Sequence, residues 1–376
     1  MSIRTVLVVG AGIAGSTVAC LLGRRRLAVT VVERSGAQRS SGSPVDVRGP
    51  ALRVVERMGL LPSIHARATR TTRLAAVDAD GALIGWIPTQ SGPRAIEIPR
   101  GDLAAILTAA ARDQAEFRYD DTVTGLRGDA GGVEATFEHG PAQRFDLVIG
   151  ADGLHSTVRR LAFGPEERFA THLGLSIATL MLDAPAADPR TVLIHSTPGR
   201  AAILHPTNGR EGAAFIFRHA RFPAESTRHP GDRLDLLTTT YDGMQWRVPE
   251  FLDRFRTTDD FYFDGVSRIR VDRWSRGRTV LVGDAAGCVS LLGEGSSMAV
   301  AGAATLAAHL RQEPDDVAAA LRGYERVHRR RLRPHHAAAP LAGHLLVPAT
   351  RGGVATRDTL FRAYAATHPR AYGGRG

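Results

Sequence analysis

The chain has 376 residues, of which 43% are hydrophobic and 23% charged, a balance typical of a folded globular protein rather than a disordered chain. Its formal net charge of +10 would suit a nucleic-acid partner, but every basic residue is an arginine and the arginines are scattered, so we expect neither DNA nor RNA binding. No apolar run approaches the ~20 residues that a membrane-spanning helix needs, and we expect no signal peptide, because the first strand follows at once. The only cysteines, Cys20 and Cys288, have no metal-ligand residues nearby. We therefore expect a cytoplasmic, metal-free protein of two domains, or of one large domain with an insert.

The stretch from Thr5 to Arg34 carries the strongest local pattern. A short apolar run of buried-strand type leads into a G-x-G-x-x-G sequence made by Gly10, Gly12 and Gly15, and a helix and a second apolar run ending on Glu33 follow. In this pattern the first glycine makes a tight turn, the second lets a pyrophosphate approach the backbone, and the third lets the helix pack on the strand. The helix N-terminus presents free N–H groups to phosphates, and an acid roughly twenty residues downstream can bind ribose hydroxyls. The stretch predicts a dinucleotide-binding site.

The chain beyond this stretch alternates between two kinds of segment. Helical phasing predicts helices at Pro50–Leu60 and Leu103–Arg112, while Asp80-Gly81 predicts a hairpin turn between two short strands. Residues 167–270 contain strand-like runs without intervening helices in their first half, which indicates an antiparallel sheet. Residues 278–283 again form an apolar run of parallel-strand type. Helices are expected at Ser296–Arg311, Ala318–Arg333 and within Leu341–Ala365.

These segments predict a discontinuous cofactor domain with an inserted sheet. We assign residues 1–72, 99–166 and 271–335 to the cofactor domain, residues 73–98 and 167–270 to the inserted substrate domain, and residues 336–376 to a C-terminal helical segment.

Three separated motifs resemble the FAD fingerprints of one family. They are GAGIAGSTVACLL…VVER, GADGLHSTVR at Gly150–Arg159, and RTVLVGDAAG at Arg278–Gly287. Together they are similar to the para-hydroxybenzoate-hydroxylase-like (class A) flavoprotein monooxygenases, which include tetracycline-modifying and polyketide-tailoring oxygenases. The resemblance implies an α/β fold: a Rossmann-like (GR2-type) FAD-binding domain, an inserted antiparallel-sheet substrate domain and C-terminal helices.

The resemblance also implies roles for individual residues. The glycine-rich turn would hold the FAD pyrophosphate, Glu33 the adenosine ribose, Arg34 would lie over the adenine, Arg100 near the phosphate and ribityl region, and Asp284 on the ribityl chain. The full implied cofactor set is Gly10, Gly12, Ala14, Gly15, Glu33, Arg34, Arg100, Asp152, Gly153, Gly283, Asp284, Gly293, Gly295 and Ser296. Free N–H groups of a helix starting near Gly295 would stabilise negative charge on the reduced flavin ring.

The implied reaction consumes NADPH or NADH and O2. The nicotinamide reduces FAD, O2 gives a flavin C4a-hydroperoxide, and one oxygen is delivered to a small aromatic or polyketide-like metabolite. No side chain has to act as a nucleophile, because the flavin drives the reaction. The candidate catalytic residues, expected beside the flavin, are Arg48, Leu291 and Leu292. The loop after Asp284 lacks the proline that the family commonly carries there. Only one G-x-G-x-x-G is present, so no separate nicotinamide domain is expected.

For the substrate, polar and aromatic residues of the inserted sheet are the candidates. They are His195, His205, Phe215, Phe217 and Arg218. The period of a strand places Phe215 and Phe217 on one face and Arg218 on the other, so a regular strand cannot bring all three into one pocket. Two other interpretations stay open: a flavin-scaffold cyclase or isomerase that needs neither NADPH nor O2, and a flavin-binding sensor. The oligomeric state is expected to be monomer or homodimer.

Overall fold

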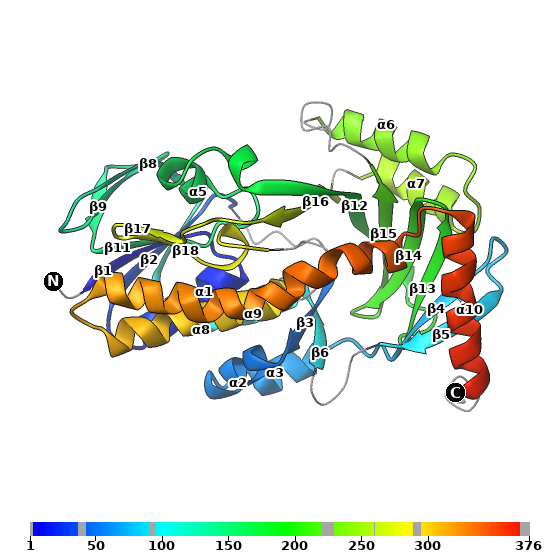
Figure 1. Ribbon diagram of the computed structural model, residues 1–376, viewed down its shortest axis with the longest axis horizontal. Helices are drawn as coiled ribbons and strands as arrows, with labels where there is room; N and C mark the ends of the chain where they lie inside the picture. The colour runs from blue at the N-terminus through cyan, green and yellow to red at the C-terminus, as the bar shows by residue number, and fades with distance from the viewer. Residues whose placement is uncertain are drawn as a thin grey trace.

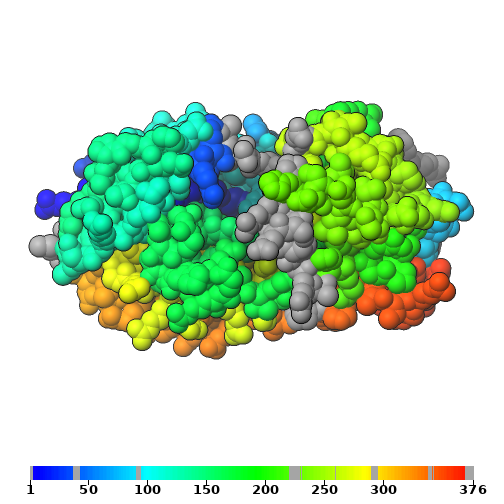
Figure 2. Space-filling model, turned by 90° about the horizontal axis from the view of Figure 1, so that it is seen from above, coloured from blue at the N-terminus to red at the C-terminus, as the bar shows by residue number. Residues whose placement is uncertain are grey.

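The computed structural model describes residues 3–36, 43–89, 95–219, 229–258, 260–288 and 295–368. Two lobes lie side by side, and one long helix, α9 (Val317–Leu346), runs from the first lobe to the second (Figure 1). Seen from above, the surface between the lobes is hollowed, and blue residues of the N-terminal part of the chain are visible inside the hollow (Figure 2).

The first lobe is built on a six-stranded sheet in the order β17-β18-β11-β1-β2-β7. Its strands are parallel except at β17, and α1 (Ile13–Gly23) packs between α4 (Arg100–Arg112) and α8 (Gly295–Gln312). Because both faces are covered, the central strands are apolar throughout, as in the run Val6 to Val9. The strands are β1 (Thr5–Val9), β2 (Ala28–Glu33), β7 (Glu116–Tyr119), β11 (Leu147–Gly150), β17 (Ser275–Arg276) and β18 (Thr279–Leu281).

Smaller elements surround this sheet. A three-stranded antiparallel sheet consists of β8 (Val123–Gly128), β9 (Val133–Phe137) and β10 (Gln143–Phe145), and a two-stranded sheet of β3 (Pro44–Arg48) and β6 (Ala95–Pro99). The short helices are α2 (Pro50–Arg57), α3 (Leu61–Ala66), α5 (Thr157–Ala162) and the 3-10 turns η1 (Glu166–Arg168) and η2 (Gly283–Ala285).

The second lobe is a seven-stranded sheet in the order β16-β12-β15-β14-β13-β4-β5. All of its neighbouring pairs are antiparallel except β13–β4, which is parallel and has the long connection that parallel pairing requires. The strands are β4 (Arg73–Val77), β5 (Leu83–Pro88), β12 (Ala170–Pro185), β13 (Thr191–Thr197), β14 (Arg200–Thr207), β15 (Arg210–Arg218) and β16 (Tyr262–Ile269).

Helices cover parts of both faces of the second sheet. On one face, α6 (Pro230–Tyr241) and α7 (Val248–Arg256) pack on an aromatic cluster in which Phe215 stacks on Tyr241 at 3.9 Å between ring centroids. On the other, α10 (Arg351–Thr367) packs so closely on β5 that a Cβ at Gly85 would lie 2.5 Å from the backbone of Phe361. The hairpin expected at Asp80-Gly81 joins β4 and β5.

The α/β fold class is confirmed, but some helix boundaries differ from the expected ones, most of all the end of α9. The helix expected to end at Arg333 continues to Leu346, although Pro334 and Pro340 each remove a backbone donor. Packing in both lobes holds it, because Tyr324 is buried in the first core and Val347, its C-cap, in the second. Among the described residues, no helix is long and apolar enough to span a membrane.

Candidate functional site

The turn between β1 and α1 is tightly packed at Gly10 and Gly15 and exposed at Gly12. The Gly10 N–H donates to the carbonyl of Val32 at 2.7 Å, which ties the turn to β2. A Cβ at Gly15 would overlap the carbonyl oxygen of Gly10, so only glycine lets the helix pack here. A Cβ at Gly12 would have no atom within 4 Å, so the backbone at the start of α1 is exposed. This open helix N-terminus fits a pyrophosphate.

Glu33 lies against this turn. Its Oε2 accepts from the Ala11 N–H at 2.8 Å and its Oε1 from the Ser35 N–H at 3.0 Å, while Arg34 is exposed beside it. The carboxylate is therefore held at the rim of the turn, at the end of the second strand. Ribose binding by Glu33 and adenine stacking by Arg34 stay predictions.

The turn after β11 lies against the same glycines. A Cβ at Gly10 would come within 2.6 Å of the Ala151 carbonyl oxygen, so the two turns touch. Asp152 accepts from the Ser156 hydroxyl and, at 2.9 Å, from the Val158 N–H, and burial raises the pKa of its carboxyl. Asp152 thus orders the start of α5, and Gly153 follows it with φ +81°.

Arg159, on α5, ties this turn to η2. The side chain is fully buried and donates to the Leu154 carbonyl at 2.6 Å, to Glu166 Oε2 at 2.8 Å and to the Ala285 carbonyl at 3.3 Å. Sequence reasoning quoted this arginine within GADGLHSTVR but gave it no role. Its place between two candidate cofactor turns makes it a positioning residue.

The turn at Asp284 completes the group. Gly283 has φ +65°, and a Cβ there would lie 2.8 Å from the Cβ of Ala14 on α1, so the turn packs directly on the glycine-rich helix. Asp284 Oδ1 lies 3.5 Å from the Cβ position of Gly295, the first residue of α8. Residues far apart in sequence, Gly10–Gly15 and Asp284, therefore meet at one place.

The first turn of α8 also anchors β3. Ser297 Oγ donates to the Asp46 carbonyl at 2.7 Å and accepts from the Arg48 N–H at 2.9 Å, and Ser296 beside it is buried. The backbone of Arg48 is thereby fixed near the start of α8, and a place of Arg48 beside the flavin stays a prediction. Leu291, Leu292 and Gly293 lie outside the described residues.

Arg100 begins α4, where its side chain is exposed and its N–H donates to the Ser43 carbonyl at 3.2 Å. Burial raises the pKa of the Cys288 thiol, and Arg100 is close enough to Cys288 to act against that rise. A part in FAD binding stays a prediction for Arg100.

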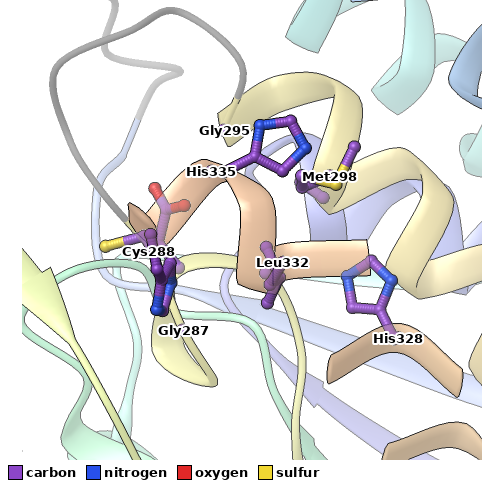
Figure 3. A pocket seen from close by; sticks show the side chains of 11 residues that line it. Gly287, Cys288, Gly295, Met298, His328, Leu332 and His335 are labelled. Atoms are coloured by element: carbon purple, nitrogen blue, oxygen red, sulfur yellow. The ribbon is translucent and has the colours of Figure 1, made fainter. Parts of the chain in front are cut away.

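A small pocket lies behind Asp284, between α8 and α9 (Figure 3). It leaves about 20 Å³, room for one water molecule. Met298 of α8 and His328, Leu332 and His335 of α9 line it, together with Cys288. Burial, with Arg331 adding to it, lowers the pKa of His328 to about 4, so this ring is neutral near pH 7.

A larger cavity of about 320 Å³ lies between β3–β6 and the second sheet. Leu180, Val192, Ile203 and Ile216 contribute apolar surface, and His205 is one of the few polar groups. Of the five substrate candidates, His205 lines this cavity.

The other four candidates do not line this cavity. Phe215 and Phe217 are fully buried in the aromatic cluster under α6 and α7. His195 points to the same side, where its ring lies 6.0 Å from that of Trp246 and its Nδ1 bonds the Val77 carbonyl at 3.1 Å. Arg218 faces the opposite side and donates to the Val347 carbonyl at 2.8 Å, at the end of α9.

Sequence reasoning missed two carboxylates on the cavity wall. Asp46 of β3 and Glu97 of β6 line the cavity and lie opposite each other in the two-stranded sheet. A signal was available, because each acid interrupts a β-branched run, VDV in one strand and IEI in the other.

Comparison with known proteins gives a consistent result. The family described as "FAD binding domain" matches residues 4–333. An uncharacterised protein of Mycobacterium tuberculosis is 40% identical over 325 residues, covering 83% of this chain and 86% of that protein. A flavin-dependent monooxygenase of Legionella longbeachae is 30% identical over 316 residues, covering 81% and 80%.

Solved structures agree with the sequence comparison. The crystal structure of tetracycline destructase Tet(51) superposes with a TM-score of 0.83 at 28% identity, covering 96% of each chain. The matched residues include all three turns that meet around Gly12. The chain belongs to the FAD-binding-domain family of flavin-dependent monooxygenases similar to para-hydroxybenzoate hydroxylase.

Proposed function

We propose that the protein is an FAD-dependent monooxygenase that uses NADPH or NADH and O2 to oxygenate a small, largely apolar metabolite of aromatic or polyketide type. The observation that carries this proposal is the convergence of the open turn at Gly12, the turn at Asp284 and the N-terminus of α8. A cavity of about 320 Å³ lies between the lobes, within the size range of sites for small molecules.

Each turn has a task in holding the cofactor. The start of α1 would bind the pyrophosphate through backbone N–H groups, Glu33 would accept from ribose hydroxyls, and Asp284 would accept from the ribityl chain. The N-terminus of α8 would stabilise negative charge on the reduced ring. When bound, FAD supplies the redox and oxygen chemistry, while the chain binds, orients and shields the substrate.

The test starts from the purified protein. It should carry FAD, and an accepted aromatic or polyketide compound should stimulate NADPH oxidation with matching O2 uptake. A protein that neither retains FAD nor binds it on reconstitution would refute the proposal. Anaerobic turnover of the compound without NADPH would instead establish a redox-neutral cyclase or isomerase.

Other expectations from the sequence stay predictions. They are the domain boundaries, the cytoplasmic location and a monomeric or homodimeric state.

A further inference from the structure

Two carboxylates lie side by side on the two-stranded sheet that forms one wall of the large cavity. Asp46 of β3 and Glu97 of β6 are direct partners in this antiparallel pair, so their side chains emerge on the same face. Like charges placed directly opposite destabilise a sheet. Both residues line the cavity, where most of the other lining side chains are apolar. This destabilising pair of acids therefore lies where a ligand in the cavity could donate hydrogen bonds to it.

The hydrogen bonds of Glu97 are concentrated on one of its oxygens. Oε1 accepts from the hydroxyls of Thr69 and Thr71, the second at 2.6 Å, and lies 3.2 Å from Nε2 of His205. Within the described part of the chain, Oε2 of Glu97 has no hydrogen-bond partner and is solvent-accessible. Burial acts to raise the pKa of Glu97, but His205 and the threonines outweigh it and lower the pKa. An ionised oxygen therefore stays available to the cavity.

Asp46 is in a different environment. The Ser297 hydroxyl donates to the backbone carbonyl of Asp46. Among the described residues, the carboxyl oxygens of Asp46 have no hydrogen-bond partner and are solvent-accessible. Burial is the main reason that its pKa is raised, Glu97 raises it further, and Arg48 and His205 act in the opposite direction. Arg48 is not among the residues that line the cavity.

His205, on β14 of the second lobe, contacts Glu97 from across the cavity. Its Nδ1 lies 2.9 Å from the Pro206 carbonyl and its Nε2 faces Glu97, and neither oxygen has a proton to give. The Thr207 hydroxyl also lies 3.4 Å from Nδ1. Of the described residues that line the cavity, the titratable ones are Asp46, Glu97 and His205. The other polar side chains among these described lining residues are the hydroxyls of Ser43, Thr89 and Thr207, and no arginine is among them.

We propose that Asp46 and Glu97 form an acceptor pair that binds an O–H or N–H donor of an otherwise apolar substrate and excludes substrates bearing a carboxylate. This inference rests on the proposed function, because it takes the cavity as the substrate site. A donor placed between the pair satisfies two partly buried acceptors at once, whereas a carboxylate is repelled by the ionised Glu97. His205 acts as a positioning residue that keeps Glu97 ionised.

The test measures binding to the FAD-loaded protein with three probes that share one ring system. 2-Naphthol offers a donor, 2-methoxynaphthalene has none, and 2-naphthoate carries a carboxylate. Quenching of probe fluorescence reports binding without any turnover. We expect naphthol to bind about tenfold more tightly than the methyl ether, as for a hydrogen bond to a charged group, and naphthoate to bind most weakly.

Two isosteric variants test whether Glu97 and Asp46 cause the preference for naphthol. In Glu97→Gln and in Asp46→Asn the preference for naphthol over the ether should fall severalfold, and the double variant should admit naphthoate. Glu138→Gln, an exposed acid in the β9–β10 region, is the matched control and should behave as the wild type. Retained FAD and an unchanged melting temperature show that each variant is folded.

Three results would contradict the proposed acceptor pair. Naphthoate binding as tightly as naphthol to the wild type, probe preferences that survive in the double variant, or no binding by any probe would each overturn the acceptor pair. If Glu97 and His205 served only as an ion pair between the lobes, Glu97→Gln would lower the melting temperature and leave the preferences unchanged. Failure of the proposed function is distinguished separately, because it appears as a protein that does not bind FAD.

Discussion

The turns that meet around Gly12 and the wall of the large cavity are built in opposite ways. At the turns, backbone groups and glycines make the surface, and each turn is encoded by a few consecutive residues such as Gly10–Gly15. At the cavity wall, side chains from β3, β6 and β14 make the surface, and Asp46, Glu97 and His205 lie far apart in the sequence. The first region suits the binding of one fixed cofactor, whereas the side chains of the second region can differ according to the substrate.

The two regions also differ in what a substitution does. At Gly10 and Gly15, an added methyl group meets backbone atoms that cannot move aside, whereas at the wall a carboxylate can become an amide of the same shape. Substitutions at the turns should therefore affect folding or FAD binding, and substitutions at the wall should affect ligand choice.

Gly15→Val should have the largest effect. The added side chain overlaps the carbonyl of Gly10, so the free energy of unfolding should fall by about 3 kcal/mol or more and FAD should be lost. Gly12→Ala is the matched control, because its methyl group meets open space: the melting temperature of the FAD-free protein should stay unchanged while FAD affinity falls about tenfold or more. Thermal unfolding and FAD fluorescence measure the two effects, and equal losses of stability in both variants would contradict the packing described.

Arg159→Met should have the next largest effect. It removes a buried cation that links Glu166 and two carbonyls, so urea denaturation should show a loss of about 3 kcal/mol. Its exposed neighbour supplies the control, since Arg160→Met should change stability by no more than about 0.5 kcal/mol. Indistinguishable variants would mean that Arg159 does not hold the Asp152 and Asp284 turns together.

His328 should make the protein sensitive to acid. Its folded-state pKa is about 4 against an ordinary 6.5, so below pH 6.5 the unfolded chain takes up a proton that the folded protein does not. Stability should therefore fall by up to about 3 kcal/mol as the pH drops from about 6.5 to about 4. His328→Leu should flatten this fall, whereas the exposed His65→Leu should keep it; parallel curves for the two variants would exclude His328 as the cause.

His155 should give the smallest effect, at the opposite end of the pH range. Its ring bonds Glu166 at 2.8 Å and Asp264 at 3.1 Å, and these hydrogen bonds, with Asp264 the larger cause, raise its pKa to about 10. The contribution to stability is present in full below about pH 6.5 and is lost as the pH rises through about 10. Because the ring is exposed, we expect the melting temperature of His155→Gln to lie only slightly below that of the wild type near pH 7 and to converge with it near pH 10. A gap that widens with pH would contradict this pairing.

Sequence reasoning was successful where structure is encoded locally. The first strand, its glycine turn, the hairpin at Asp80-Gly81 and the strand before Asp284 all depend on short patterns, and the structure contains each of them. It could not separate lining residues from core residues in the second sheet, because the two faces of a strand are told apart only by what packs on them. Phe215 and His205 are both plausible lining residues by composition, and α6 and α7 decide that the phenylalanine is core. The helix continuing past Pro334 likewise depends on packing in both lobes.

FAD titration of the wild type, Gly12→Ala and Asp284→Ala tests the central claim most directly, because both turns are taken to hold one molecule. Quenching of FAD fluorescence should give one FAD per wild-type chain and clearly weaker binding in each variant, with folding retained. Full-affinity binding by both variants, or no FAD binding by the wild type, would contradict the account.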